Sequence, residues 1–325
     1  MKHFVVVLFL LAVFSVAGRS EELRLESSAD AMGSTYSLVL YGDNQAKLET
    51  AAEEAFEEVR RLDRMLSNYL AGSEWSEVNR FAAQRPVKVS AELFGLLSKC
   101  VEYSRQSEGA FDISVGPLMK VWGFYKGSGH LPRKAEIQGA LSKVGYRNIM
   151  LDPGEKTVRF ARAGVELDPG GIGKGYAVDR MVDVLRKSGI DAALVSASGS
   201  SIYALGAPPE ESGWKVGIRD PKNEAVTVTE VTLRNESMST SGNYEKFFLA
   251  EGKLYSHIMD PRTGYPAEGT LSASVIAPLT LDSEAWAKPF YINGPGWAVK
   301  HKPNGFRVFL CTAEIGTGQS CAWLQ

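Results

Sequence analysis

Helix-type and strand-type patterns occupy different parts of this chain, and their order restricts the fold more than any other feature. After one expected strand at 35–41, apolar residues recur mainly at helical spacing, and strand-like segments dominate afterwards. The expected helices cover 48–66, 90–104 (with Ser90 as N-cap) and 174–187, and the later strands cover 192–196, 214–218, 226–233, 271–276 and 306–310. Because no regular strand–helix–strand repeat is visible, the chain is predicted to be α+β and not a doubly wound sheet.

Composition excludes several classes of protein. The 325 residues are 44% hydrophobic and 23% charged, which is typical of a folded protein and not of a disordered, collagenous or coiled-coil chain. Thirty-six Lys and Arg residues stand against 38 Asp and Glu residues, giving a formal net charge of -2. The chain therefore has no overall positive field that would draw it onto nucleic acid.

The N-terminus has the pattern of a secretory signal peptide. Lys2 and His3 precede the apolar run 4–16, which is too short to span a bilayer comfortably, and small residues follow at 15–18. We expect residues 1–18 to be removed on export, which places 19–325 in the periplasm or on the extracytoplasmic face of the membrane. The alternative is a retained anchor, so membrane association is expected only through an uncleaved N-terminus.

Export also bears on the three cysteines. In an oxidising compartment Cys311 and Cys321, ten residues apart, are able to form a disulfide. Cys100 would be left over. It lies in an apolar helical stripe, which favours a buried, inert thiol over a catalytic one.

A glycine-dense loop, 167–176, runs directly into one of the expected helices. Such a loop lets backbone N–H groups approach a phosphate, the helix N-terminus adds positive potential, and Lys174 adds a charge. A phosphate or pyrophosphate ligand is the natural interpretation, and a tight strand-to-helix turn is the alternative. The loop is not a nucleotide P-loop, because Gly175 stands where Ser or Thr would bind magnesium.

A second segment, 256–266, holds His257, Asp260 and Arg262 within six residues and follows the polar stretch 240–244. These groups are suited to acid–base chemistry beside an anion. The alternative is a structured turn in which Asp260 caps backbone amides. The other histidines lack such neighbours, so a zinc site is not expected.

A third segment, 109–118, places small residues beside large aromatic ones and ends near Trp122 and Phe124. This composition fits a wall against a planar ligand. A turn within the protein core explains it equally well.

In this order and at these spacings, the segments resemble the ApbE family, the FAD:protein FMN transferases, from about Ala31 to Gly294. The matching motifs are 31–34, 62–79, 109–112, 168–176, 240–244 and 257–266. The resemblance implies a single α+β flavin-binding domain related to the T-fold, with mixed helices and antiparallel sheets. It implies that the protein takes FAD and Mg2+, breaks the pyrophosphate and attaches FMN to a Thr of an exported acceptor protein, releasing AMP. Some members of the family instead hydrolyse FAD to FMN and AMP.

The resemblance also assigns roles to individual residues. His257 matches the catalytic histidine, which would accept a proton, while Lys174 and the loop amides would neutralise the pyrophosphate. The positions that match FAD contacts are Met32, Tyr69, Ala110, Phe111, Asp112, Asp168, Lys174 and Ile258.

The metal site is where the chain departs from the family. The resemblance implies a backbone carbonyl near Gly171 together with the Asp and the Thr of an Asp-Ala-Leu-Ala-Thr segment, and this chain has Glu284 and Lys288 at the side-chain positions. Glu reaches about one methylene further than Asp, and an ammonium group cannot ligate Mg2+. We expect Lys288 to occupy the position of the metal, which would leave a slow enzyme or a flavin-binding protein without transferase activity.

A shifted alignment is the alternative, because Pro289 disfavours helix at Lys288, and Asp282 would then supply the carboxylate.

A second departure is 195–201, where Ser residues replace an Asn and a Gly-Gly-Asp segment that many members have. Hydroxyl groups still hydrogen-bond a ribityl or phosphate oxygen. In addition, Pro169 removes a backbone N–H beside the glycine loop.

Overall fold

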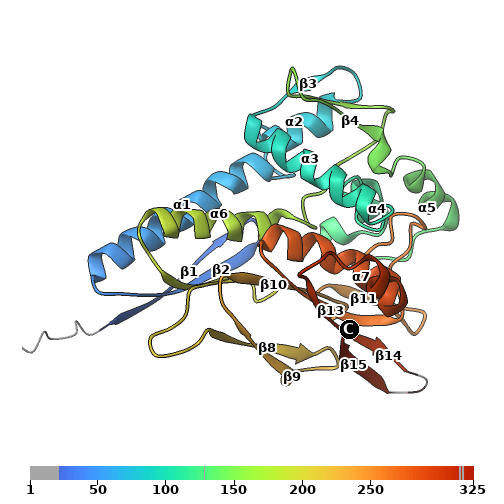
Figure 1. Ribbon diagram of the computed structural model, residues 1–325. Helices are drawn as coiled ribbons and strands as arrows, with labels where there is room; N and C mark the ends of the chain where they lie inside the picture. The colour runs from blue at the N-terminus through green and yellow to red at the C-terminus, as the bar shows by residue number, and fades with distance from the viewer. Residues whose placement is uncertain (1–21, 128, 315, 317) are drawn as a thin grey trace, which may run out of the picture.

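The computed structural model describes residues 22–127, 129–314, 316 and 318–325, so the expected signal peptide, 1–18, lies outside the described residues. Among the described residues, the largest element is an eight-stranded sheet in which neighbouring strands are antiparallel (Figure 1). The predicted α+β class is confirmed. In spatial order the strands are β1 (Leu23–Ala31), β2 (Ser34–Gly42), β6 (Ala192–Ala197), β7 (Ser201–Leu205), β10 (Glu236–Gly242), β13 (Thr270–Ala277), β14 (Arg307–Ala313) and β15 (Gln319–Trp323).

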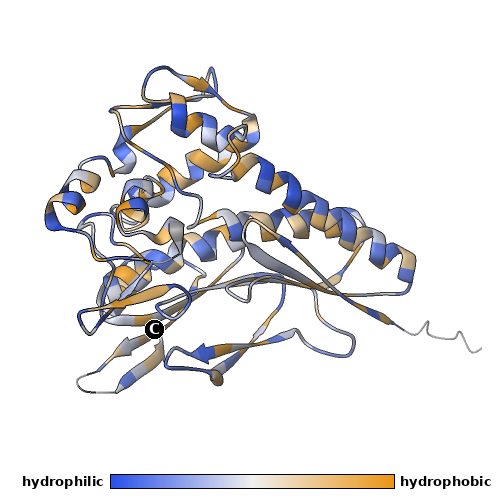
Figure 2. Ribbon diagram, turned by 180° about the vertical axis from the view of Figure 1, so that it is seen from behind, coloured by the Kyte–Doolittle hydropathy of each residue, from blue (hydrophilic) through white to orange (hydrophobic). Residues whose placement is uncertain are grey.

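Long helices cover one face of this sheet (Figure 1). In α1 the apolar residues recur at helical spacing, so Leu48, Phe56 and Leu62 are buried on one side. Seen from behind in Figure 2, the helices above the sheet carry hydrophilic and hydrophobic residues in alternation, as expected for helices with one buried face. The three helices of this layer are α1 (Gln45–Leu66), α6 (Gly173–Lys187) and α7 (Thr280–His301).

A β-hairpin covers part of the opposite face of the sheet (Figure 1). It consists of β8 (Trp214–Asp220) and β9 (Asn223–Leu233). Every second residue of β8 is buried, and Trp214 packs in one apolar cluster with Met238 and Phe309 of the sheet. The hairpin therefore closes an apolar layer of its own beneath the sheet.

The remaining elements lie around the helix layer (Figure 1). As predicted, Ser90 caps a helix, since its side chain accepts a hydrogen bond from the Leu93 N–H at 3.2 Å. The other helices are α2 (Glu74–Phe81), α3 (Ala91–Gln106), α4 (Gly116–Val121), η1 (Phe124–Lys126), α5 (Lys134–Leu141) and η2 (Tyr146–Asn148). The remaining strands are β3 (Val87–Lys88), β4 (Ile149–Asp152) and β5 (Thr157–Phe160), and the hairpin of β11 (Phe247–Ala250) and β12 (Lys253–Ser256). Of these elements, α2, β3 and β4 lie at the top of Figure 1, whereas β11 lies close to α7.

The sequence pattern does not predict α7, which runs from Thr280 to His301 with a kink at Gly294, where φ is 71° and the backbone is not helical. Pro289 lies inside it, and its first half is buried on nearly all sides, so no one-sided apolar stripe is visible. Lys288 is helical here, and Asp282 accepts a hydrogen bond from the Tyr103 hydroxyl at 2.5 Å, away from the cavity described below. The alternative of a shifted alignment is therefore wrong.

Cys311 and Cys321 form a disulfide that joins β14 to β15, where the two residues lie directly opposite each other. Cys100 is fully buried in α3, and burial raises the pKa of its thiol, so the prediction of a buried cysteine is confirmed. None of the helices in the described part of the chain is long and apolar enough to cross a membrane.

Candidate active site

A deep cavity of about 880 Å³ opens beside the glycine loop. Its walls come from this loop, α7, β10, the β8–β9 hairpin and the segments 63–70 and 110–125. The fold therefore gathers, in one place, every residue to which the family resemblance gives a role. These residues are Met32, Tyr69, Ala110, Phe111, Asp112, Asp168, Gly171, Lys174, His257, Ile258, Glu284 and Lys288.

The glycine loop is folded onto the protein itself. Asp168 accepts the N–H of Gly170 at 2.7 Å, and the Pro169 carbonyl accepts two further loop N–H groups at 2.8 and 3.0 Å. The Glu284 carboxylate accepts the N–H of Gly175, in the first turn of α6, at 2.5 Å. Because these amides already have partners, the prediction that loop amides neutralise a pyrophosphate does not hold at these positions.

Two glycines make room for side chains of α7. A Cβ atom on Gly175 would lie 2.5 Å from the Thr280 carbonyl oxygen and 2.8 Å from Oε2 of Glu284. A Cβ atom on Gly171 would lie 3.3 Å from Cε of Lys288. The glycines of the loop are therefore explained by the close approach of α7 as well as by a ligand.

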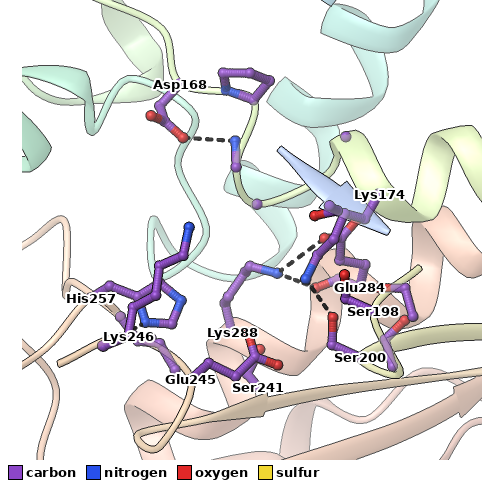
Figure 3. A pocket seen from close by; sticks show the side chains of 18 of the residues that line it. Asp168, Lys174, Ser198, Ser200, Ser241, Glu245, Lys246, His257, Glu284 and Lys288 are labelled. Carbon is purple, nitrogen blue, oxygen red and sulfur yellow. Dashed lines mark hydrogen bonds and ion pairs between the residues drawn. The ribbon is translucent and has the colours of Figure 1, made fainter. Parts of the chain in front are cut away.

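Two lysines from adjacent helices converge on one region of the cavity (Figure 3). Lys174 of α6 donates a hydrogen bond to the Ser200 hydroxyl. Lys288 of α7 donates to the backbone carbonyl of Glu284 at 3.0 Å, and its Nζ lies 3.9 Å from Oε1 of the same residue. Burial lowers the pKa of Lys288, the Glu284 carboxylate opposes this change, and the charge of Lys174 adds to it.

These groups do not form a magnesium site. Mg2+ requires near-octahedral oxygen ligands at about 2.0–2.1 Å, but one Glu284 oxygen is held by the Gly175 N–H and the Lys288 ammonium stands beside the other. At an effective dielectric constant of about 20, unit charges about 4 Å apart interact by about 4 kcal/mol, so Lys288 would repel the ion. Within 22–127, 129–314, 316 and 318–325, no group of three or more His, Cys, Asp or Glu side chains is placed to hold a metal ion.

His257 supplies the imidazole of the cavity. Its Nδ1 lies 3.1 Å from the Lys246 carbonyl oxygen, which only accepts, so Nδ1 carries the proton. Burial lowers the pKa of His257 to about 4; the Lys246 carbonyl opposes this change, and the charges of Lys246, Lys288 and Lys174 add to it. At neutral pH the ring is therefore neutral, and Nε2 is able to accept a proton.

Two carboxylates of the cavity wall are engaged within the protein. Asp112 accepts the Ser114 N–H at 2.8 Å and hydroxyl at 2.6 Å, and its second oxygen accepts the Tyr146 N–H at 2.5 Å. Burial raises the pKa of Asp112 and Asp168, and their hydrogen-bond donors oppose that change. Asp112 thus fixes the shape of the loop that carries Phe111.

The predicted wall for a planar ligand is partly correct. Phe111 and Phe124 line the cavity, and Tyr69 lies at its margin with 79% of its surface exposed. Trp122 does not line it. Its indole N–H instead donates to the Gly264 carbonyl at 2.9 Å within a separate apolar cluster.

The predicted acid–base trio is divided. The Arg262 side chain donates to both carboxylate oxygens of Asp260, at 2.8 and 2.9 Å, and neither residue lines the cavity. The alternative of a structured turn is correct for this pair. His257 alone of the three faces the site.

Tyr125, Arg219 and Lys246 are among the cavity residues that the sequence did not predict. Burial raises the pKa of Tyr125, and the charge of the Asp168 carboxylate adds to this change. Lys246 lies two residues after the 240–244 motif, and that proximity was a usable signal. Nothing in the strand alternation of β8 distinguishes Arg219 from other exposed residues.

The fold and the cavity define an α+β protein with one large site, which is lined by three lysines and a neutral histidine. The sequence model of the ApbE family matches residues 32–308, and the chain belongs to that family. It is 34% identical to the FAD:protein FMN transferase of Klebsiella pneumoniae (strain 342), over 80% of this chain and 79% of that protein. It is 32% identical to the FAD:protein FMN transferase of Treponema pallidum (strain Nichols), over 89% of this chain and 84% of that protein. The crystal structure of the ApbE protein of Thermotoga maritima is similar with a TM-score of 0.84 and 29% identity, covering 92% of this chain and 96% of that one.

Proposed function

We propose that this protein is an FAD:protein FMN transferase, which cleaves the pyrophosphate of FAD and attaches the FMN half to a Thr hydroxyl of an acceptor protein, releasing AMP. The observation that carries the proposal is that all twelve residues with assigned roles, from segments spread along the chain, line one cavity. Its volume of about 880 Å³ lies near the upper end of the usual range of roughly 300–1,000 Å³ for ligand sites, as a dinucleotide requires. Membership of the ApbE family and the activity named for the two relatives support it.

The chain's own residues account for the steps of this transfer. The acceptor oxygen forms a bond to the phosphorus of the FMN half, and the bond from that phosphorus to the bridging oxygen breaks, so AMP leaves with that oxygen. The proton of the acceptor hydroxyl goes to Nε2 of His257, which is neutral because of burial. Lys174 and Lys288 offset the charge of the pyrophosphate, and the aromatic residues of the wall orient the flavin half.

A single assay tests the proposal. Purified full-length protein is incubated with FAD and a Thr-containing acceptor domain from a flavin-carrying protein, and the products are identified by mass spectrometry. We expect the acceptor mass to rise by one FMN unit with release of AMP, and an acceptor with Thr replaced by Ala to stay unlabelled. Release of free FMN and AMP without labelling would identify a pyrophosphatase instead, and FAD that is bound but unchanged would identify a flavin-binding protein.

We propose in addition that the protein works outside the cytoplasm on an exported acceptor. The apolar run 4–16 behind Lys2 supports export, and the Cys311–Cys321 disulfide suits an oxidising compartment. Cell fractionation with N-terminal sequencing of the purified protein tests this. An N-terminus near residue 19 in the periplasmic fraction is expected, whereas an intact chain confined to the cytoplasm would contradict it.

A further inference from the structure

Glu284 and Lys288 line the cavity but do not fit a divalent cation, because Lys288 is an ammonium and the Glu284 carboxylate is engaged by the Gly175 N–H and by Lys288. We infer that the Lys288 ammonium, held in place by α7, binds the pyrophosphate of FAD where a magnesium ion would otherwise stand, so that nucleotide binding and transfer need no divalent cation. The identity of the ligand rests on the proposed function. The independence from magnesium is a property of these side chains and is measurable by binding alone.

The Lys288 ammonium is held in the cavity beside the glycine loop. Its side chain is 21% exposed and passes Gly171 of the glycine loop so closely that a methyl group there would lie 3.3 Å from Cε. One of its three N–H groups donates to the Glu284 carbonyl at 3.0 Å, one helical turn back. The two remaining N–H groups are available to oxygens of a bound phosphate, and hydrogen bonds from an ammonium to an anion are among the strong ones.

The Glu284 carboxylate contacts both Lys288 and the backbone of α6, so it is not available as a metal ligand. Its side chain is 3% exposed, Oε2 accepts the Gly175 N–H, and Oε1 lies 3.9 Å from Nζ of Lys288. A buried carboxylate needs such partners, since an uncompensated buried charge is strongly destabilising. The pair is thus a built-in cation with its counter-ion, which joins α7 to the start of α6.

Lys174 gives a second positive charge in the same region. It is positioned by the Ser200 hydroxyl, and its charge is close enough to lower the pKa of Lys288. Two ammonium groups from neighbouring helices therefore face the same region of the cavity, and the Glu284 carboxylate is the counter-ion of one of them (Figure 3). Several loop amides are already engaged, so positive side chains carry much of the work of holding a pyrophosphate.

The first experiment measures FAD affinity of the unaltered full-length protein, by titration calorimetry, in excess EDTA and in excess magnesium. If FAD binding is not coupled to magnesium binding, the dissociation constants for FAD in EDTA and in magnesium are expected to agree within about twofold. An affinity that rises about tenfold or more when magnesium is added would overturn the inference. Inorganic pyrophosphate, titrated separately, tests whether the phosphate end of the site is sufficient for binding.

Two variants test whether Lys288 is the cation. In EDTA, Lys288→Met should weaken FAD binding about 10- to 100-fold, because a charge-assisted contact is lost while the side-chain volume is kept. The double variant Glu284→Asp with Lys288→Thr should bind FAD weakly in EDTA and recover when magnesium is added. Lys300→Met is the matched control, since Lys300 is an exposed lysine of the same helix outside the cavity, and its affinity should not change. Unchanged binding in Lys288→Met, with circular dichroism showing a folded protein, would contradict the role of Lys288.

The labelling assay separates this inference from the proposed function. An acceptor labelled only when magnesium is present would leave the transferase activity standing and overturn the inference. FAD bound equally well in EDTA and magnesium, with no labelling in either, would support the inference and contradict the transferase. Labelling at similar rates in both solutions is the result expected when both are correct.

Discussion

At the scale of single residues, the chemistry of this site depends on which groups are charged. His257 is kept neutral by burial and by three nearby lysines, while Lys288 has a carboxylate beside it. A neutral imidazole accepts a proton, and an ammonium holds an anion. The same region of the cavity therefore provides both the base and the positive charge that phosphoryl transfer requires.

Replacing His257 by Asn should lower the rate of acceptor labelling about 100- to 10,000-fold, since a general base is lost. FAD affinity should change little, because the histidine acts on the acceptor hydroxyl. Labelling rates and calorimetric affinities of the variant check this. His130→Asn, which changes an exposed histidine that does not line the cavity, is the control and should behave like the unaltered protein.

The pH profile of kcat/KM should show its acid limb near pH 4. Below the pKa of about 4, His257 is protonated and cannot accept a proton, so the rate should fall about tenfold per pH unit. Above this pKa, the titration of His257 should no longer change the rate. The profile is measured by labelling rates at low FAD, with circular dichroism at each pH to confirm folding. An acid limb near 6.5, the ordinary value for histidine, would show that the imidazole is not buried in solution.

At the scale of secondary-structure elements, the site depends on how closely α7 approaches the start of α6. The Gly175 N–H and the Glu284 carboxylate join the two helices, and no side chain fits at position 175 without displacing the Thr280 carbonyl. This contact also sets the position of Lys288, one turn along α7 from Glu284.

Gly175→Ala should therefore destabilise the protein by about 1–3 kcal/mol, the usual cost of overpacking a tight contact, and should weaken FAD binding. The free energy of unfolding, from denaturant titration, and the FAD affinity measure both effects. Gly95→Ala is the matched control, because Gly95 is exposed within α3 with no atom within 4 Å of the added methyl group. It should raise stability, by up to about 1 kcal/mol, through helix propensity.

The helices that sequence patterns predict are those with one buried face, and the strands they predict are rich in β-branched or aromatic residues. The helix stripes of α1, α3 and α6 and the strands β2, β6, β8, β9, β13 and β14 are found close to the expected positions. By contrast, the first half of α7 is buried on nearly all sides and contains Pro289. β1 was missed although the exposure of its residues alternates. The twelve cavity residues with assigned roles were recognisable from the family resemblance, whereas Arg219 was not. Asp260 and Arg262 pair with each other while His257 faces the cavity, and this division depends on tertiary packing that spacing does not encode.

At the scale of the whole molecule, the Cys311–Cys321 disulfide joins β15, at the edge of the central sheet, to β14. Neither cysteine lines the cavity. Cys321→Ala should lower the free energy of unfolding by about 3 kcal/mol, as expected for a loop of this length, and leave FAD affinity unchanged. Denaturant titration and calorimetry measure the two quantities. A reducing agent should have the same effect on the unaltered protein and none on the variant, because Cys100 is buried and unpaired. Loss of FAD binding in the variant would contradict this separation of edge and site.

The cavity is lined by residues from Met32 to Ile292, so no early part of the chain contains a nucleotide site. Contacts between such distant segments form late and slowly during folding. A chain that emerges from a ribosome or a secretion pore thus gains the site only when α7 has packed. The amount of bound flavin would therefore report the fraction of completely folded chains. A truncation just before α7 would abolish flavin binding and not merely weaken it.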